Sequence, residues 1–112
     1  MAVVLFMRVP ELDSVGYDAM MVSLELDAHP PDGLLLHVAS EAVGAVNIVE
    51  VWLTPEAARS FVESRLEPAL KSHEVRDPLS YRLEPLHNAW PANLEVIGLT
   101  RGADVTRSAR AS

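Results

Sequence analysis

The chain has 112 residues, of which 49% are hydrophobic and 22% charged, a length and balance typical of one globular domain. Its formal net charge is −7 and Lys71 is its single lysine. Ahead of its last dozen residues it therefore lacks the clustered positive charge that binding to nucleic acids or anionic membranes requires. Cysteine is absent, which excludes disulfides, thiolate metal sites and a cysteine nucleophile.

The N-terminal residues 1–8 are apolar but have the features of neither a signal peptide nor a membrane span. They lack a basic start and a small-residue cleavage site. No stretch of the chain approaches the roughly 20 apolar residues of a membrane-spanning helix. We therefore expect a cytoplasmic protein in which residues 2–8 form a buried first strand.

Helix and turn signals follow the first strand. Asp13 or Ser14 can cap a helix over about 14–26, whose apolar stripe includes Tyr17, and the His-Pro-Pro-Asp-Gly segment 29–33 ends it. Residues 33–40 and 45–53 read as two strands joined by a tight turn at Gly44, which predicts a hairpin.

The second half of the chain begins with a strong helix start at Thr54-Pro55-Glu56. Apolar residues then mark one helix face as far as Leu70, and Pro68 should kink or split that helix. Residues 79–87 predict a fourth strand in which Pro85 lies at an edge or an end. Residues 94–99 are a candidate short fifth strand.

This order is β-α-β-β-α-β, which predicts an α+β fold of the ferredoxin-like type with both helices on one face of the sheet. We expect a single domain over residues 1–100 and a flexible polar tail over 101–112. The first three strands are apolar on both faces, so a second copy of the chain should cover the open face. Two sheets paired in this way would form a homodimeric barrel with an enclosed cavity.

The segment Glu50-Val-Trp52-Leu-Thr-Pro-Glu-Ala57, followed by Phe61, resembles a strand-to-helix passage of the dimeric α/β-barrel superfamily, in particular its antibiotic-biosynthesis-monooxygenase-like branch. The resemblance implies a homodimer that binds a hydrophobic small molecule. Members of this superfamily include cofactor-free oxygenases and polyketide cyclases. Haem-degrading members carry a histidine on the second helix, where this chain has residues 61–63 (Phe-Val-Glu). A haem-degrading role is therefore disfavoured, and we expect no cofactor.

Strand alternation predicts which face each candidate site residue occupies. The apolar set Leu34, Leu36 and Val38 is expected to face the helices, which leaves His37 on the cavity side. The same argument places Ile48, Glu50 and Trp52 on the cavity side and Val49, Val51 and Leu53 on the helix side.

His37 and Glu50 are neighbours across the predicted hairpin, and a histidine–carboxylate pair in an apolar cavity can serve as a general acid or base. Trp52 can stack on a planar ligand. Tyr81 and His87 share one face of the fourth strand and are expected at the barrel mouth. No metal site is predicted, because the four histidines are scattered along the chain.

Each of these residues also has a simpler interpretation. His37 and Glu50 can pair structurally at a dimer interface, and Trp52 can be a core residue. The first functional hypothesis is a small cofactor-independent enzyme, monooxygenase-like or cyclase-like, acting on an aromatic or polyketide-like molecule. The alternative is a non-catalytic ligand-binding or structural homodimer of the same fold. A third hypothesis is a regulatory dimer that binds another protein through its tail.

Overall fold

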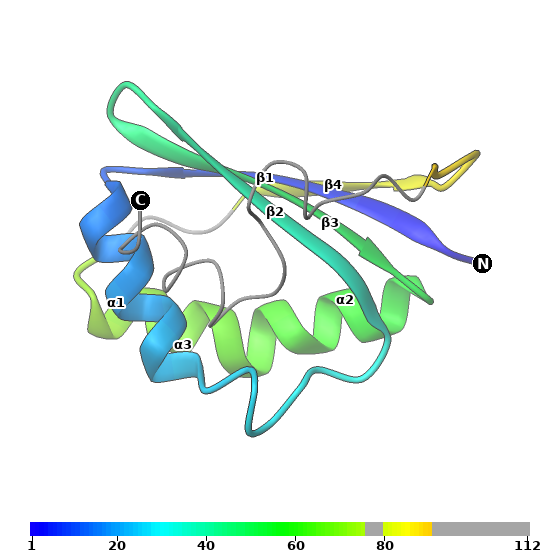
Figure 1. The fold of residues 1–112 in the computed structure, drawn as a ribbon, viewed down its shortest axis with the longest axis horizontal. Helices are drawn as coiled ribbons and strands as arrows, with labels where there is room; N and C mark the ends of the chain where they lie inside the picture. The colour runs from blue at the N-terminus through cyan, green and yellow to red at the C-terminus, as the bar shows by residue number, and fades with distance from the viewer. Residues whose placement is uncertain (76–79, 91–112) are drawn as a thin grey trace.

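The computed structural model describes residues 1–75 and 80–90, which form four strands and two helical regions (Figure 1). The predicted fifth strand over 94–99 and the predicted tail over 101–112 lie outside the described residues. In chain order the elements are β1 Val3–Pro10, α1 Ser14–Leu24, β2 Leu34–Ala42, β3 Ala45–Trp52, α2 Pro55–Phe61, η1 Val62–Leu66, α3 Glu67–Ser72 and β4 Tyr81–Pro85.

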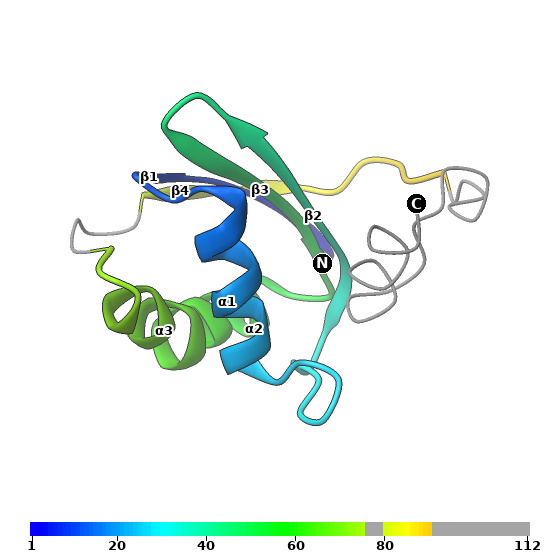
Figure 2. The ribbon, with the colours of Figure 1, turned by 60° about the vertical axis from the view of Figure 1, so that its left-hand side comes forward.

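The four strands form one antiparallel sheet in the order β2-β3-β1-β4. Figures 1 and 2 show α1 and the continuous region α2-η1-α3 on the same side of this sheet. The prediction of an α+β, ferredoxin-like fold with both helices on one face is therefore confirmed. Below, the sheet face that the helices cover is the inner face, and the opposite face is the outer face.

Side-chain caps start both helical regions where the sequence predicts them. Asp13 Oδ1 accepts a hydrogen bond of 2.8 Å from the backbone N–H of Gly16. Thr54 Oγ1 accepts one of 3.1 Å from Ala57, with Pro55 at the start of the helix. Each cap satisfies an N–H group that has no partner within its own helix, so the chain enters each helix at a defined residue.

The second helical region passes through Pro68 by changing its hydrogen-bond pattern. Pro68 has no N–H, and its ring crowds the carbonyl group one turn earlier. The preceding segment η1 is π-helical, and Glu67 donates its N–H to Val62, five residues earlier. The proline therefore splits the region into two α-helical pieces, α2 and α3, joined by a π-helical turn.

The core lies between the helices and the inner face. Alternate residues of β1 point into it, and Met20 of α1, Val62 of η1 and Leu70 of α3 meet them there, all close to fully buried. This burial of apolar surface is the dominant stabilising contribution to the fold. No helix among the described residues is long and apolar enough to cross a membrane, and the cytoplasmic location stays a prediction.

The strand register shows that the predicted side-chain faces were wrong except for Leu34, which faces the helices as expected. Glu50 pairs with the buried Leu5 and also with His37, so both polar side chains share the inner face with the helices. Leu36 and Val38, expected against the helices, lie on the outer face and are 44% and 47% exposed. The same inversion applies to β3: Ile48 and Trp52 are on the inner face, and Val49 and Val51 are on the outer face.

Two physical features account for the inversion. A register shift between Leu34 and Leu36 interrupts the alternation of β2, so Leu34 pairs with Trp52 on the inner face and Leu36 pairs with Val51 on the outer face. In addition, β2 is an edge strand, so its side chains have strand neighbours on one side only and those on the outer face stay partly exposed.

The loop before β2 makes Gly33 sensitive to substitution. Its φ is +86°, and a Cβ atom there would lie 3.1 Å from Ala57 Cβ, whereas Gly44 has a φ of +72° with nothing within 4 Å of such an atom. We expect Gly44→Ala to lower the free energy of unfolding by about 1 to 2 kcal/mol through backbone strain alone, and Gly33→Ala to lower it further. Urea denaturation of both variants tests this, and equal losses would contradict the role of the Ala57 contact.

Candidate functional site

Four side chains on the inner side of the sheet form one continuous hydrogen-bonded chain, referred to below as the polar chain. The hydroxyl group of Tyr17 lies 2.5 Å from His37 Nε2, and His37 Nδ1 lies 2.5 Å from Glu50 Oε2. Trp52 Nε1 donates to Glu50 Oε1 at 3.0 Å. The polar chain therefore joins α1, β2 and β3 through side chains alone.

Local structure places each member. The β2–β3 hairpin sets His37 directly opposite Glu50, and Trp52 follows Glu50 by two residues and so shares its face. Tyr17 lies in the first turn of α1, where its N–H bonds to the carbonyl group of Asp13 at 2.9 Å. The Tyr17 and His37 rings stack, with their centroids 6.0 Å apart and their planes 15° from parallel.

Glu50 is the one buried charged or polar residue among those described, with 1% of its surface exposed. An isolated carboxylate in such a place is strongly disfavoured unless it is hydrogen-bonded or paired. Trp52 can only donate, and a neutral His37 with its proton on Nδ1 also donates, so an ionised Glu50 has a donor on each oxygen. His37 Nε2 then accepts from the Tyr17 hydroxyl group.

Within the described residues, no buried side-chain nitrogen or oxygen lacks a hydrogen-bond partner. The hydrogen bonds of the polar chain all lead toward Glu50: the Tyr17 O–H donates to His37, His37 donates to Glu50, and Trp52 donates to Glu50 from the other side. Hydrogen-bonded groups in this order can pass a proton inward without leaving a buried donor or acceptor unpaired.

The environment keeps Tyr17 protonated. Burial is the larger cause, and the negative charges of Glu50 and then Asp18 add to it, so the pKa of the Tyr17 hydroxyl group is raised above its ordinary value. At neutral pH Tyr17 is therefore a neutral hydrogen-bond donor.

One end of the polar chain approaches solvent and the other is enclosed. The side chain of His37 is 18% exposed at the β2 edge of the sheet, whereas that of Glu50 is 2% exposed. Trp52 is fully buried and packs against Phe61 of α2, with ring centroids 5.3 Å apart. A molecule in solution would meet the polar chain at its Tyr17–His37 end.

The predicted pairing of His37 with Glu50 is confirmed, but its setting differs from the prediction. The pair lies between sheet and helices, so it does not line a cavity between two sheets. Trp52 likewise has the setting of a core residue and binds Glu50. The alternation of side chains along a strand correctly predicted that His37, Glu50 and Trp52 share one face, but it assigned that face to the wrong side of the sheet.

Tyr81 and His87 do not join the polar chain. Tyr81 is on the inner face but pairs with Met7, and β1 separates it from β3, a distance of roughly 10 Å between strands. His87 is exposed and lies beyond β4, which ends at Pro85, so the expectation that His87 shares a strand face with Tyr81 is wrong. Pro85 is the last residue of β4, as predicted, because proline has no N–H group to donate to a neighbouring strand.

Sequence reasoning missed Tyr17, which it assigned to the apolar stripe of the first helix. The available signal was the hydroxyl group itself, since a tyrosine directed at a sheet needs a polar partner there when it is buried. His37 is that partner, but only the tertiary structure brings the two residues together.

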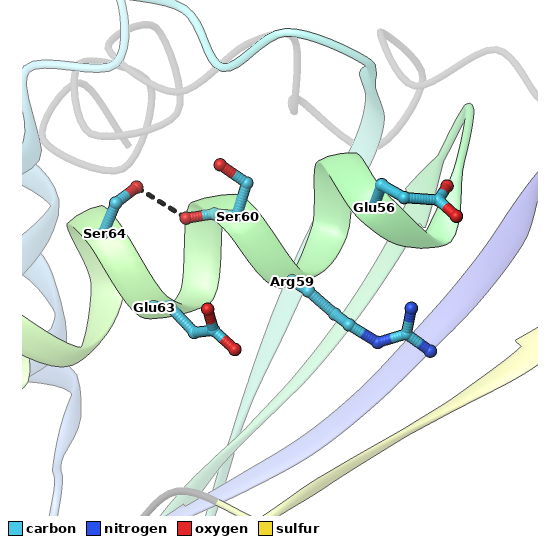
Figure 3. A pocket seen from close by; sticks show the side chains of 5 residues that line it. All are labelled: Glu56, Arg59, Ser60, Glu63 and Ser64. Carbon is cyan, nitrogen blue, oxygen red and sulfur yellow. Dashed lines mark hydrogen bonds between the residues drawn. The ribbon is translucent and has the colours of Figure 1, made fainter.

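A pocket on the exposed surface of α2 and η1 contains no member of the polar chain. It is an open depression lined by Glu56, Arg59, Ser60, Glu63 and Ser64, and Ser64 donates its hydroxyl proton to the Ser60 carbonyl group (Figure 3). These side chains show no shared chemistry and none is buried. Within the described ranges 1–75 and 80–90, no three acidic or histidine side chains gather as a metal site. The polar chain is therefore the better candidate site.

Comparison with known proteins gives a fold assignment. No family model and no curated protein matches the chain. Among solved structures, NE2512 from Nitrosomonas europaea, a protein of unknown function, superposes with a TM-score of 0.61 and 13% identity, covering 82% of this chain and 96% of its own. A variant of SnoaB, a cofactor-independent oxygenase from Streptomyces nogalater, superposes with a TM-score of 0.58 and 11% identity. The match covers 81% of this chain and 98% of the SnoaB chain.

A candidate antibiotic biosynthesis monooxygenase from Deinococcus radiodurans gives a TM-score of 0.51 and 21% identity, covering 83% of this chain and 99% of its own. The chain shares the fold of these proteins. This confirms the resemblance carried by residues 50–61 at the level of fold. The low identities leave activity and substrate to be argued from the residues themselves.

The raised pKa of Tyr17 predicts a loss of stability in alkali. The folded protein holds this proton more tightly than the unfolded chain, so the free energy of unfolding should fall as the pH rises above 10, the ordinary pKa of tyrosine. Tyr17→Phe should lower the free energy of unfolding by about 1 kcal/mol at neutral pH, because it loses a hydrogen bond. The same substitution should make the decrease in stability above pH 10 smaller. Urea denaturation from pH 8 to 11 checks both effects, and parallel curves for the two proteins would contradict the second.

Proposed function

We propose that this protein is a small cofactor-independent enzyme, monooxygenase-like or cyclase-like, that acts on a hydrophobic aromatic or polyketide-like molecule. The observation that carries this proposal is the hydrogen-bonded sequence Tyr17–His37–Glu50, which leads from a partly exposed imidazole to a buried carboxylate. Titratable groups that are hydrogen-bonded in a chain at the edge of a core are typical of proton-transfer sites.

The main requirement of either reaction is acid–base catalysis by the protein. The proton of a substrate hydroxyl group would pass along the polar chain and end on His37, which leaves a phenolate or enolate, and Glu50 would stabilise the resulting imidazolium. The hydrogen bond to Glu50 would hold the proton on His37 while the substrate anion reacts. A cyclase would use the anion directly as a carbon nucleophile.

A monooxygenase would instead let the anion reduce dioxygen, which serves as the oxidant. One electron passes to dioxygen, and the two radicals combine to form a carbon–oxygen bond. The resulting peroxide then loses a carbon-bound proton as its oxygen–oxygen bond breaks. The overall balance turns a methylene group and dioxygen into a carbonyl group and water, and His37 returns its proton to the leaving oxygen. SnoaB, which shares the fold, is a cofactor-independent oxygenase.

A non-catalytic role is the alternative, and the burial of Glu50 and Trp52 is the observation that favours it. Each polar atom of these two side chains has a hydrogen-bond partner within the protein, and the pocket on α2 lies elsewhere. Under this hypothesis the polar chain fixes the packing of α1 on the β2–β3 hairpin, and the domain binds a ligand or simply forms a homodimer.

The catalytic proposal predicts that His37→Ala abolishes turnover. We expect oxygen uptake and quinone formation with 1,8-dihydroxyanthrone, a phenolic probe with an acidic methylene group, and a loss of about 10²- to 10⁴-fold in the variant. The control is His29→Ala, which removes an exposed histidine outside the polar chain. Circular dichroism verifies folding. Equal rates for His37→Ala and the control would reject the role of His37.

We infer separately that a second copy of the chain covers the outer face. Apolar side chains extend across this face on three strands: Val4, Phe6, Leu36, Val38, Val49 and Val51. Arg82 lies over the Phe6 ring at 4.2 Å and covers the β4 side, while Leu36 and Val38 stay exposed at the β2 side. An apolar sheet face is self-complementary under two-fold symmetry, so an identical face is its natural partner.

Val38→Glu is expected to break this homodimer. The side chain is already 47% exposed in the single chain, so the substitution should leave the fold intact but place a charge in the interface. Val43→Glu at the 98% exposed hairpin tip is the matched control. Native mass spectrometry should give a two-chain mass for the unmodified protein and the control, and a one-chain mass for Val38→Glu. A one-chain mass for the unmodified protein would reject the inference.

A further inference from the structure

We propose that Tyr17 is the catalytic residue that exchanges the proton with the substrate, and that His37 acts behind it. A phenolic or enolic hydroxyl group would approach Tyr17 at the β2 edge, on the side of the sheet that carries α1. This inference rests on the proposed function and assigns its substrate-contacting group. It moves the site away from the interface between two sheets, where sequence reasoning had placed it.

The first argument is that His37 has no free nitrogen. Nδ1 is hydrogen-bonded to Glu50 and Nε2 to Tyr17, both at 2.5 Å. An imidazole ring has only these two polar atoms, so a substrate can reach neither while both bonds are intact. A direct transfer to His37 would first require the Tyr17 side chain to leave a position in which its ring stacks on that histidine.

The second argument is that Tyr17 retains acceptor capacity. A phenolic oxygen has one donor hydrogen and two lone pairs, and donation to His37 uses only the hydrogen. Tyr17 is half-buried, unlike Glu50 and Trp52, so its side of the polar chain is the one that solvent reaches. A substrate hydroxyl group can therefore donate to Tyr17 without breaking any bond of the polar chain.

The third argument is proton balance. As the substrate O–H bond breaks, its proton forms a new O–H bond on Tyr17, and the original Tyr17 proton moves to His37 Nε2. Tyr17 is neutral before and after, and the charges created are a substrate anion and an imidazolium beside Glu50. Since the burial of Tyr17 and the nearby Glu50 disfavour its free phenolate, the two transfers must be coupled.

Trp52 has a positioning role in this scheme. Its indole N–H holds Glu50 Oε1 at 3.0 Å, which leaves Oε2 directed at His37. An oriented carboxylate fixes which imidazole nitrogen carries the proton, so Nε2 stays an acceptor toward Tyr17. Trp52 itself is too deeply buried to touch a substrate at the β2 edge.

The test uses 4-nitrophenol, whose phenolate is coloured, in a buffer below the pH at which it ionises in water. Binding to the unmodified protein should produce phenolate absorbance as His37 takes up the proton. Tyr17→Phe removes one oxygen atom and keeps the ring, so it should bind the probe but reduce the rate of ionisation at least about tenfold. Ser23→Ala removes a hydroxyl group from the same helix outside the polar chain and should behave as the unmodified protein.

The outcomes separate this inference from the proposed function. Probe ionisation by Tyr17→Phe at the unmodified rate would overturn the role of Tyr17, even if His37→Ala abolishes turnover. Failure of the unmodified protein to ionise the probe would overturn it as well. Ionisation that depends on Tyr17, without oxygen uptake from the anthrone, would support the proton path and reject only the oxygenase activity.

Discussion

The buried carboxylate of Glu50 is the constraint on which the arrangement of this domain depends. A carboxylate with 1% exposure requires donors, and the protein supplies them from His37 on the neighbouring strand and Trp52 on its own. His37 in turn requires a partner for its second nitrogen, which Tyr17 provides from α1. One charged group in the core thus links the β2–β3 hairpin to α1 through a continuous set of hydrogen bonds.

This polar requirement also explains the division between the two sheet faces. The inner face combines the polar chain with an apolar core, and the helices lie over this face. The outer face has no helical cover among the described residues, yet its centre is apolar. The proposed site and the proposed dimer contact therefore lie on opposite faces of one sheet. A change on one face need not disturb the other, because successive side chains of each strand point to opposite faces of the sheet.

The element order was readable from the sequence because its signals are local. Caps at Asp13 and Thr54, the turn at Gly44 and the proline at position 68 each act within a few residues, and the structure has an element boundary or a change of helix type at each. The pairing of His37 with Glu50 was also predictable, since a tight hairpin fixes which residues face each other.

The facing of those residues was not predictable, because alternation identifies two sets of side chains but not which set is buried. Their apolar character favoured Leu36 and Val38 for the core. The register shift between Leu34 and Leu36 interrupts the alternation of side chains on which that prediction relied. Tyr17 joins the site across 20 positions of sequence, and no local rule links it to His37. The sequence alone determined the fold class, the helix starts and the hairpin, since these depend on neighbouring residues. Only the tertiary structure decided the location of the polar chain, because a buried charge takes its partners from whichever elements the packing brings within hydrogen-bond distance.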